Sequence, residues 1–206
     1  MNHHFKPLRT ALGLALALSL CGPLPVALAA LAGPDAPAAT MLPGSSLYQV
    51  DAGLTDQHGQ PLRWSDLHGR PQLVSMFYAN CHLMCPLILE NAKALQKQLG
   101  ADGERLGVAV ITLDPARDTP QALAAVAADH RTPAAWRYLR PEPDAVRALA
   151  SVLGVRYRFR DDGSINHTSV LVLLDAEGRE VARSEVTGIA PDPAFVQQVR
   201  ATLAAD

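Results

Sequence analysis

Residues 72–86 of the chain read QLVSMFYANCHLMCP, and this stretch joins a strand pattern to a helix pattern. Residues 72–78 are mostly apolar and include valine and aromatic side chains, which predicts a central, buried strand. Cys81 and Cys85 follow this strand, and apolar residues at helical spacing then continue over residues 87–99. We therefore expect two thiols at the point where a buried strand ends and a helix begins.

Outward from this stretch, strand and helix patterns alternate along the chain. Residues 48–63 predict a hairpin whose turn lies at His58-Gly59. Further strands are expected over residues 106–113, 136–139, 168–174 and 179–185, and helices that begin at Thr119-Pro120, Asp144 and Asp192. Such alternation predicts the α/β class, with parallel central strands flanked by helices and closed by a C-terminal hairpin and helix.

Ligands of such sheets usually lie at the carboxyl ends of the strands. The cysteine pair follows one predicted strand, and the segment from Asp114 to Asp118 follows another. If those two strands are adjacent, both segments reach the same edge of the sheet. Spacing alone explains Asp114 and Asp118 more simply by turn and cap chemistry, with a local Arg117 ion pair, than by acid–base catalysis.

The N-terminal residues have the layout of a secretory signal peptide. Lys6 and Arg9 precede an almost uncharged run over residues 11–32, and Ala27-Leu28-Ala29 offers a small-x-small cleavage site. The run is also long enough to span a membrane as a retained tether. Prolines inside the run interrupt a spanning helix, so we favour a cleaved signal over an anchor.

Three segments follow from this pattern. Residues 1–29 are the predicted signal peptide or membrane anchor, and residues 30–46, rich in Pro, Ala, Gly and Ser, are a predicted flexible linker. Residues 47–206 are the predicted folded domain. An exported chain of this kind is expected in the periplasm or elsewhere in the cell envelope, where disulfides can persist.

Composition excludes one class of partner. The chain has 206 residues, is 49% hydrophobic and 18% charged, and carries a net charge of −2, which suits one globular domain. Cleavage after Ala29 would remove two of the 18 basic residues and none of the 20 acidic ones, which leaves a net charge of −4. Since Lys/Arg-rich runs are also absent, the sequence argues against a nucleic-acid-binding surface.

The cysteine pair has three candidate roles: a structural disulfide, a redox pair or half of a soft-metal site. At helical spacing the two Cα atoms would lie roughly 6 Å apart, near the upper end of the disulfide range, and so small a loop contributes little chain entropy. A helix N-terminus lowers thiol pKa and raises reactivity, which favours redox chemistry. Two thiolates also favour Cu(I), whereas a structural zinc site needs four closed ligands and the chain has no second cysteine pair.

His167 is the best third ligand for a metal, because it stands alone just before the strongest late strand. His82 and Met84 lie between the cysteines, and on a regular helix both side chains would point away from the cysteine face, so we treat them as auxiliary candidates. The other histidines of the folded domain have simpler explanations: His58 and His68 as solvated loop residues, and His130 as a partner of a helix C-terminus.

Taken together, three features resemble the Sco/SenC family: Cys-x-x-x-Cys-Pro after an apolar strand, the segment LDPARDTP at residues 113–120, and the late histidine. The resemblance extends from residue 47 to the C-terminus. It implies a thioredoxin-like fold, with a central mixed β-sheet flanked by helices and an N-terminal β-hairpin. It also implies copper, as Cu(I) or Cu(II), bound by Cys81, Cys85 and His167.

The resemblance further implies an exported or tethered protein that delivers copper to the binuclear copper centre of cytochrome c oxidase, or to another envelope copper protein. This metallochaperone role is the leading hypothesis. A thiol–disulfide oxidoreductase with Cys81 and Cys85 as its redox pair is the alternative, because thioredoxins share the fold.

The sequence departs from the family pattern at two positions: His82 stands where many members have proline, and Asn166 where many have an acidic residue. Neither removes a ligand, but His82 is expected to alter copper geometry or redox potential.

Overall fold

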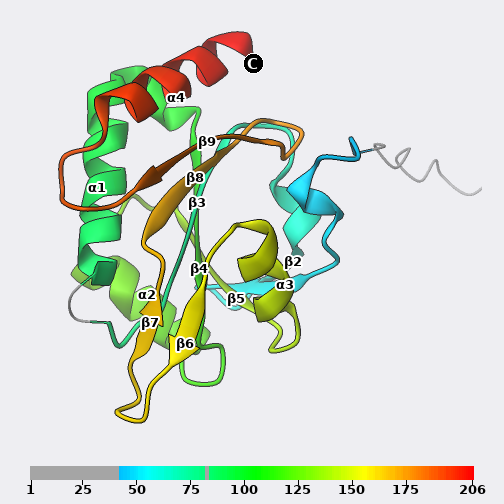
Figure 1. The fold of residues 1–206 in the computed structure, drawn as a ribbon, viewed down its shortest axis with the longest axis vertical. Helices are drawn as coiled ribbons and strands as arrows, with labels where there is room; N and C mark the ends of the chain where they lie inside the picture. The colour runs from blue at the N-terminus through cyan, green and yellow to red at the C-terminus, as the bar shows by residue number, and fades with distance from the viewer. Residues whose placement is uncertain (1–41, 82–83) are drawn as a thin grey trace, which may run out of the picture. The chain divides into compact units, whose positions relative to one another are not determined.

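The central element is a seven-stranded mixed sheet with the strand order β2-β1-β5-β4-β3-β8-β9 (Figure 1). Its strands are β1 (Gly53–Asp56), β2 (Pro61–Arg63), β3 (Gln72–Phe77), β4 (Gly107–Thr112), β5 (Arg137–Pro141), β8 (Val170–Leu174) and β9 (Glu180–Glu185). Strands β3, β4 and β5 run parallel, whereas β8 pairs antiparallel with β3, and β1 with β5. The predicted α/β class, the mixed sheet and the N-terminal hairpin of β1 and β2 are confirmed.

The computed structural model describes residues 42–81 and 84–206. The predicted signal peptide, most of the predicted linker, and His82 lie outside these ranges, so the expectations for them stay predictions. The described residues belong to one compact unit. Within the described ranges, no helix is long and apolar enough to cross a membrane.

The middle of the sheet is buried on both faces. Every residue of β3, β4 and β8 is buried, which explains why these strands read in the sequence as continuous apolar runs. The N-terminal hairpin and β9 lie at the two edges of the sheet, and three of the six residues of β9 are exposed and charged. Charged side chains protect such an edge against pairing with another chain.

In the part of the chain that the structure describes, four α-helices accompany the sheet: α1 (Met84–Leu99), α2 (Pro120–Asp129), α3 (Ala145–Val152) and α4 (Pro193–Ala205). The same ranges contain three 3-10 helices: η1 (Leu47–Gln49), η2 (Trp64–Leu67) and η3 (Gly100–Glu104). The predicted starts of two helices are confirmed, because Thr119 and Asp192 accept hydrogen bonds from the amides of the first turns. Asp144 precedes α3 as predicted, but its side chain makes no capping hydrogen bond. Figure 1 shows α1 and α4 side by side on one face of the sheet and α3 on the other.

A second, two-stranded sheet was not predicted. Strands β6 (Tyr157–Phe159) and β7 (Ile165–His167) form an antiparallel hairpin below the main sheet in Figure 1. Strands of three residues give no readable alternation, so periodicity does not reveal them. The turn itself carries a signal, since Asp162-Gly163 is a hairpin dipeptide and Gly163 has a φ of 80°. His167 is therefore the last residue of a separate hairpin rather than a residue at the entrance of β8.

Candidate metal site

The cysteines lie where β3 passes into α1, as predicted, but the connection differs from a regular helical turn. Cys81 is in the loop, and α1 begins only at Met84, so that Cys85 lies in its first turn. The backbone N–H of Cys85 donates a hydrogen bond to Cys81 Sγ at 3.3 Å. The sulfur thus occupies the position of a capping group, where the helix dipole and an amide donor favour a negative charge.

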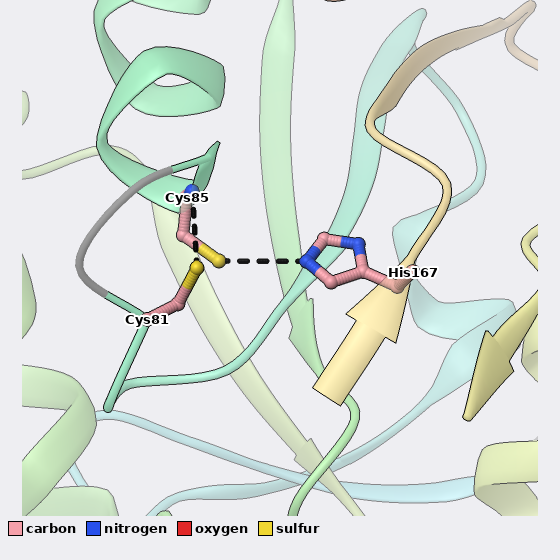
Figure 2. Close-up of side chains that lie close together, drawn as sticks. All are labelled: Cys81, Cys85 and His167. Atoms are coloured by element: carbon pink, nitrogen blue, oxygen red, sulfur yellow. Dashed lines mark hydrogen bonds between the residues drawn. The ribbon is translucent and has the colours of Figure 1, made fainter. Parts of the chain in front are cut away.

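His167 approaches the cysteines from the hairpin (Figure 2). Its Nε2 lies 3.6 Å from Cys85 Sγ, and its Nδ1 lies 3.0 Å from the carbonyl oxygen of Thr168. Because a carbonyl oxygen only accepts hydrogen bonds, this contact assigns the ring proton to Nδ1 and leaves the Nε2 lone pair facing the cysteine sulfur. The Tyr78 ring meets the imidazole edge-on, with the ring centroids 6.0 Å apart.

The three candidate ligand atoms lie within 4.8 Å of one another. An ion with metal–ligand bonds of about 2.0–2.3 Å, surrounded by three ligands, separates those ligands by about 4 Å. The arrangement of Cys81, Cys85 and His167 therefore fits a three-coordinate ion with little movement. Two sulfurs and one imidazole are the donors that a soft ion such as Cu(I) prefers. No other cluster of three or more metal-binding side chains occurs among the residues that the structure describes.

The pKa of the Cys85 thiol determines whether the site binds a metal cation easily, because Cys85 must lose its proton to act as a ligand. The hydrogen bond to Cys81 and burial raise the pKa of the Cys85 thiol well above its ordinary value. We expected the helix N-terminus to lower the pKa of both thiols, and for Cys85 this expectation is wrong, because the neighbouring sulfur and the apolar surroundings outweigh the dipole. Two adjacent thiolates here need a compensating positive charge, which a bound metal cation supplies.

A cavity of about 410 Å³ opens beside the cluster and is lined by Cys81, Met84, His167 and Tyr78, among others. Met84 therefore faces the site rather than away from it. The expectation from helical geometry is wrong for Met84, because Cys81 precedes the helix and the two cysteines do not define a helical face. The cavity reaches Cys81, the less buried of the two cysteine residues.

The segment from Asp114 to Asp118 lies beside the cysteine loop, because β4 is the parallel neighbour of β3. Asp118 is buried, and its Oδ2 accepts hydrogen bonds from the Ala79 amide, at 2.9 Å, and from the Thr112 hydroxyl. Burial raises the pKa of Asp118, although both hydrogen bonds oppose this effect. The carboxylate thus fixes the backbone two residues before Cys81, a role that the cap-and-turn interpretation missed.

The same segment also reaches the hairpin. Arg117 forms the predicted ion pair with Asp114 and donates a hydrogen bond from Nη2 to the Gly163 carbonyl oxygen at 2.9 Å. One loop therefore contacts both the cysteine segment and the tip of the hairpin that carries His167. Of the other histidines in the described ranges, His58 and His68 are exposed, as predicted, and His130 follows the last residue of α2.

The sequence is similar to known proteins. The sequence model of the SCO1/SenC family matches residues 44–203. A protein named "Putative copper-binding protein" from Stutzerimonas stutzeri is 32% identical over 130 residues, which is 61% of this chain and 63% of that relative. The matched region thus spans less than two thirds of the relative's length.

Two solved structures share the fold. Bradyrhizobium japonicum ScoI with copper bound has a TM-score of 0.61 at 23% identity and covers 75% of this chain and 96% of its own. Yeast Sco1 with copper bound has a TM-score of 0.62 at 21% identity and covers 76% of this chain and 88% of its own. The predicted thioredoxin-like architecture is confirmed by these neighbours.

Proposed function

Because this chain belongs to the SCO1/SenC family, we propose that it is a copper metallochaperone of the cell envelope that delivers copper to the binuclear copper centre of cytochrome c oxidase. The observation that carries the proposal is the convergence of Cys81, Cys85 and His167 within 4.8 Å. The name of the Stutzerimonas stutzeri relative and the copper-bound structures of two neighbours support copper as the cargo. The signal-like layout of residues 1–29 supports export.

The residues of the chain define what binding requires. Both cysteines bind as thiolates and His167 binds through the Nε2 lone pair, so the two thiol protons must leave when copper enters. The raised pKa of Cys85 makes this exchange sensitive to acid, and copper affinity is expected to fall as the pH falls. Oxidation of the two thiols to a disulfide removes both thiolate ligands, so redox state and copper release are linked.

Metal analysis of the purified, reduced protein tests the proposal. We expect one copper per chain in the wild type and none after Cys81→Ala. Cys21→Ala is the matched control, because Cys21 lies in the N-terminal segment, and in any preparation that retains that segment it should leave the copper content unchanged. Reduced wild-type protein that binds no Cu(I) in competition with a chelator contradicts the proposal.

A thiol–disulfide oxidoreductase is the second candidate, and the unequal burial of the cysteines favours it. Cys81 is partly exposed beside the N-terminus of α1, whereas Cys85 is buried behind it. In this reaction the Cys81 thiolate attacks a partner disulfide and releases one partner thiolate. Cys85 then attacks the mixed disulfide and releases the second, so the partner is reduced and the chain is oxidised to its own disulfide.

Trapping separates the two candidates. Cys85→Ser removes the resolving thiol, so an oxidoreductase should accumulate a mixed disulfide through Cys81, whereas Cys81→Ser should accumulate none. A chain that transfers copper but forms no mixed disulfide with an oxidised envelope partner is a metallochaperone without the reductase activity.

A further inference from the structure

Three arginines line one face of the β6–β7 hairpin beside the candidate metal site. Arg156, Arg158 and Arg160 alternate along the strand, and the hairpin pairing continues through Arg156 and Arg160, whose backbone groups bond to Thr168 and Ser164. Side chains two positions apart in a strand point to the same face. All three arginines are exposed. A chain with a net charge of −2 therefore presents a locally positive strand here.

These arginines are weakly engaged within the chain. Arg160 lies 3.9 Å from Asp162 in an ion pair whose two side chains are both about 60% exposed, and such pairs contribute little. Among the described residues, Arg156 and Arg158 have no carboxylate within 4.0 Å. Stabilising the fold therefore does not account for the positive charge of this strand.

The arginines share cavity walls with His167, although the pairing of Tyr157 with His167 places the imidazole on the other face of the hairpin. Arg156 and Arg158 line a cavity of about 490 Å³ whose wall includes His167, and Arg160 lines the cavity that includes Cys81 and His167. Glu185 shares the first cavity without forming an ion pair to either arginine. A molecule that sits against this strand is therefore in reach of the candidate ligands.

The opposite face of the strand exposes an aromatic side chain. Phe159 is 53% exposed, and its ring contacts only the edge of the Tyr157 ring, with centroids 6.0 Å apart, among the ring contacts of the described residues. Arginine and aromatic side chains are enriched where proteins dock on one another. A molecule that docks beside a metal-transfer site should be able to accept the metal. A protein can do this and a lipid head group cannot, so we favour a protein partner over a membrane surface.

We propose that the Arg156–Arg158–Arg160 face of the hairpin is the docking surface for an acidic protein partner. Guanidinium groups pair with carboxylates in bidentate geometry, and exposed charges at the rim of an interface mainly accelerate association. That the partner receives copper rests on the proposed function. The docking itself requires no copper. The surface selects a partner whose carboxylates surround its own metal-accepting residues.

The experiment measures association of the reduced, copper-free chain with the copper-centre domain of the same organism's cytochrome c oxidase. The test variant carries Arg156→Gln, Arg158→Gln and Arg160→Gln. The matched control carries Arg70→Gln, Lys97→Gln and Arg137→Gln, three exposed residues outside the hairpin that remove the same total charge. We expect the association rate of the test variant to be about 10-fold lower at low ionic strength, and the difference to shrink at high salt.

The outcomes separate this inference from the proposed function. Equal losses in the test and control variants, no loss in the test variant, or no association of the wild type overturns the docking surface. So does loss of binding to phosphatidylglycerol vesicles with protein association unchanged, which makes the strand a membrane contact. Copper content is measured in parallel: its absence from the wild type overturns the proposed function alone, and both variants should keep the wild-type value.

Discussion

The two cysteines and the histidine of the candidate metal site lie in parts of the fold that differ in burial and in the number of contacts that hold them. Cys81 and Cys85 follow β3, whose six residues are all buried, and the loop between them and the strand is fixed by Asp118. His167 belongs to a two-stranded hairpin outside the main sheet, with strands of three residues of which only Ile165 is buried. An isolated hairpin of this size is marginally stable. The cysteine half is therefore part of the core, and the histidine half is attached to it.

This difference indicates how the site opens. Beyond its chain connections, the hairpin is held by Ile165, which is buried in the hydrophobic core, and by Tyr157, which packs against that core. The Arg117 hydrogen bond to Gly163 and the contacts of His167 with Cys85 and Tyr78 add to this attachment. Regions with few buried contacts open at a lower free energy than the core does. The histidine is thus the ligand that can leave while both sulfurs stay in place, which gives an acceptor access to the metal. Four substitutions test the comparison, two on each half.

The largest effect is expected at the rigid half. Cys85→Ser removes one of the two thiolate ligands, so we expect copper binding to be lost altogether in competition with a Cu(I)-specific chelator. The fold should survive, because serine is slightly smaller than cysteine and no backbone change is required. Circular dichroism checks the fold. Retention of tightly bound copper by this variant would remove Cys85 from the site.

His167→Ala should weaken copper binding without abolishing it. Both thiolates remain, but the ion loses its third ligand, so the loss should exceed the about 10–100-fold that removal of an outer-shell partner costs. Chelator competition measures the affinity, and the spectrum of the copper-loaded protein should change. An unchanged affinity and spectrum would show that the attached half plays no part in holding the metal.

Asp118→Ala tests how the rigid half is positioned. Removing the carboxylate leaves the Ala79 amide and the Thr112 hydroxyl without their acceptor, at about 1–3 kcal/mol for each buried group, so the free energy of unfolding should fall. Denaturant titration measures this loss. Asp118→Asn is the control that keeps an oxygen acceptor, and it should recover most of the stability. Equal losses in the two variants contradict the hydrogen-bonding role.

The same pair of variants has a pH signature. Because burial raises the pKa of Asp118, the folded chain binds this proton more tightly than the unfolded chain does. The contribution of Asp118 to stability is therefore largest at acidic pH and declines as the pH rises from 3.8 through the raised folded pKa. In Asp118→Asn this decline should disappear, which unfolding titrations at a series of pH values detect.

The core half of the molecule was predictable from the sequence, and the attached half was predictable only in part. Strand β3, the start of α2 at Thr119 and the proximity of the Asp114–Asp118 segment to the cysteines follow from apolar runs, cap chemistry and the rule for parallel strands. His167 was selected because it stands alone just before a strong late strand and the chain also offers a cysteine pair at a strand end, whereas its hairpin was too short to give a periodic signal. The orientation of Met84 was wrong because it depended on where the helix begins, which a few residues of loop geometry decide.

The smallest effect is expected for Arg117→Gln, and it should be confined to the attached half. The Arg117 side chain is about half exposed, although its partner Asp114 is buried, so the global free energy of unfolding should fall by less than it does in Asp118→Ala, where the carboxylate acceptor and the hydroxyl donor are both buried. The lost hydrogen bond to Gly163 should instead speed amide hydrogen exchange in β6 and β7 relative to β3 and β4. Arg179→Gln is the matched control, since it removes a similarly exposed arginine paired with Asp175 at the other end of β8. Uniform acceleration across the sheet, or equal acceleration in the control, would mean that the hairpin is not held through Arg117 and that the two halves of the site open together.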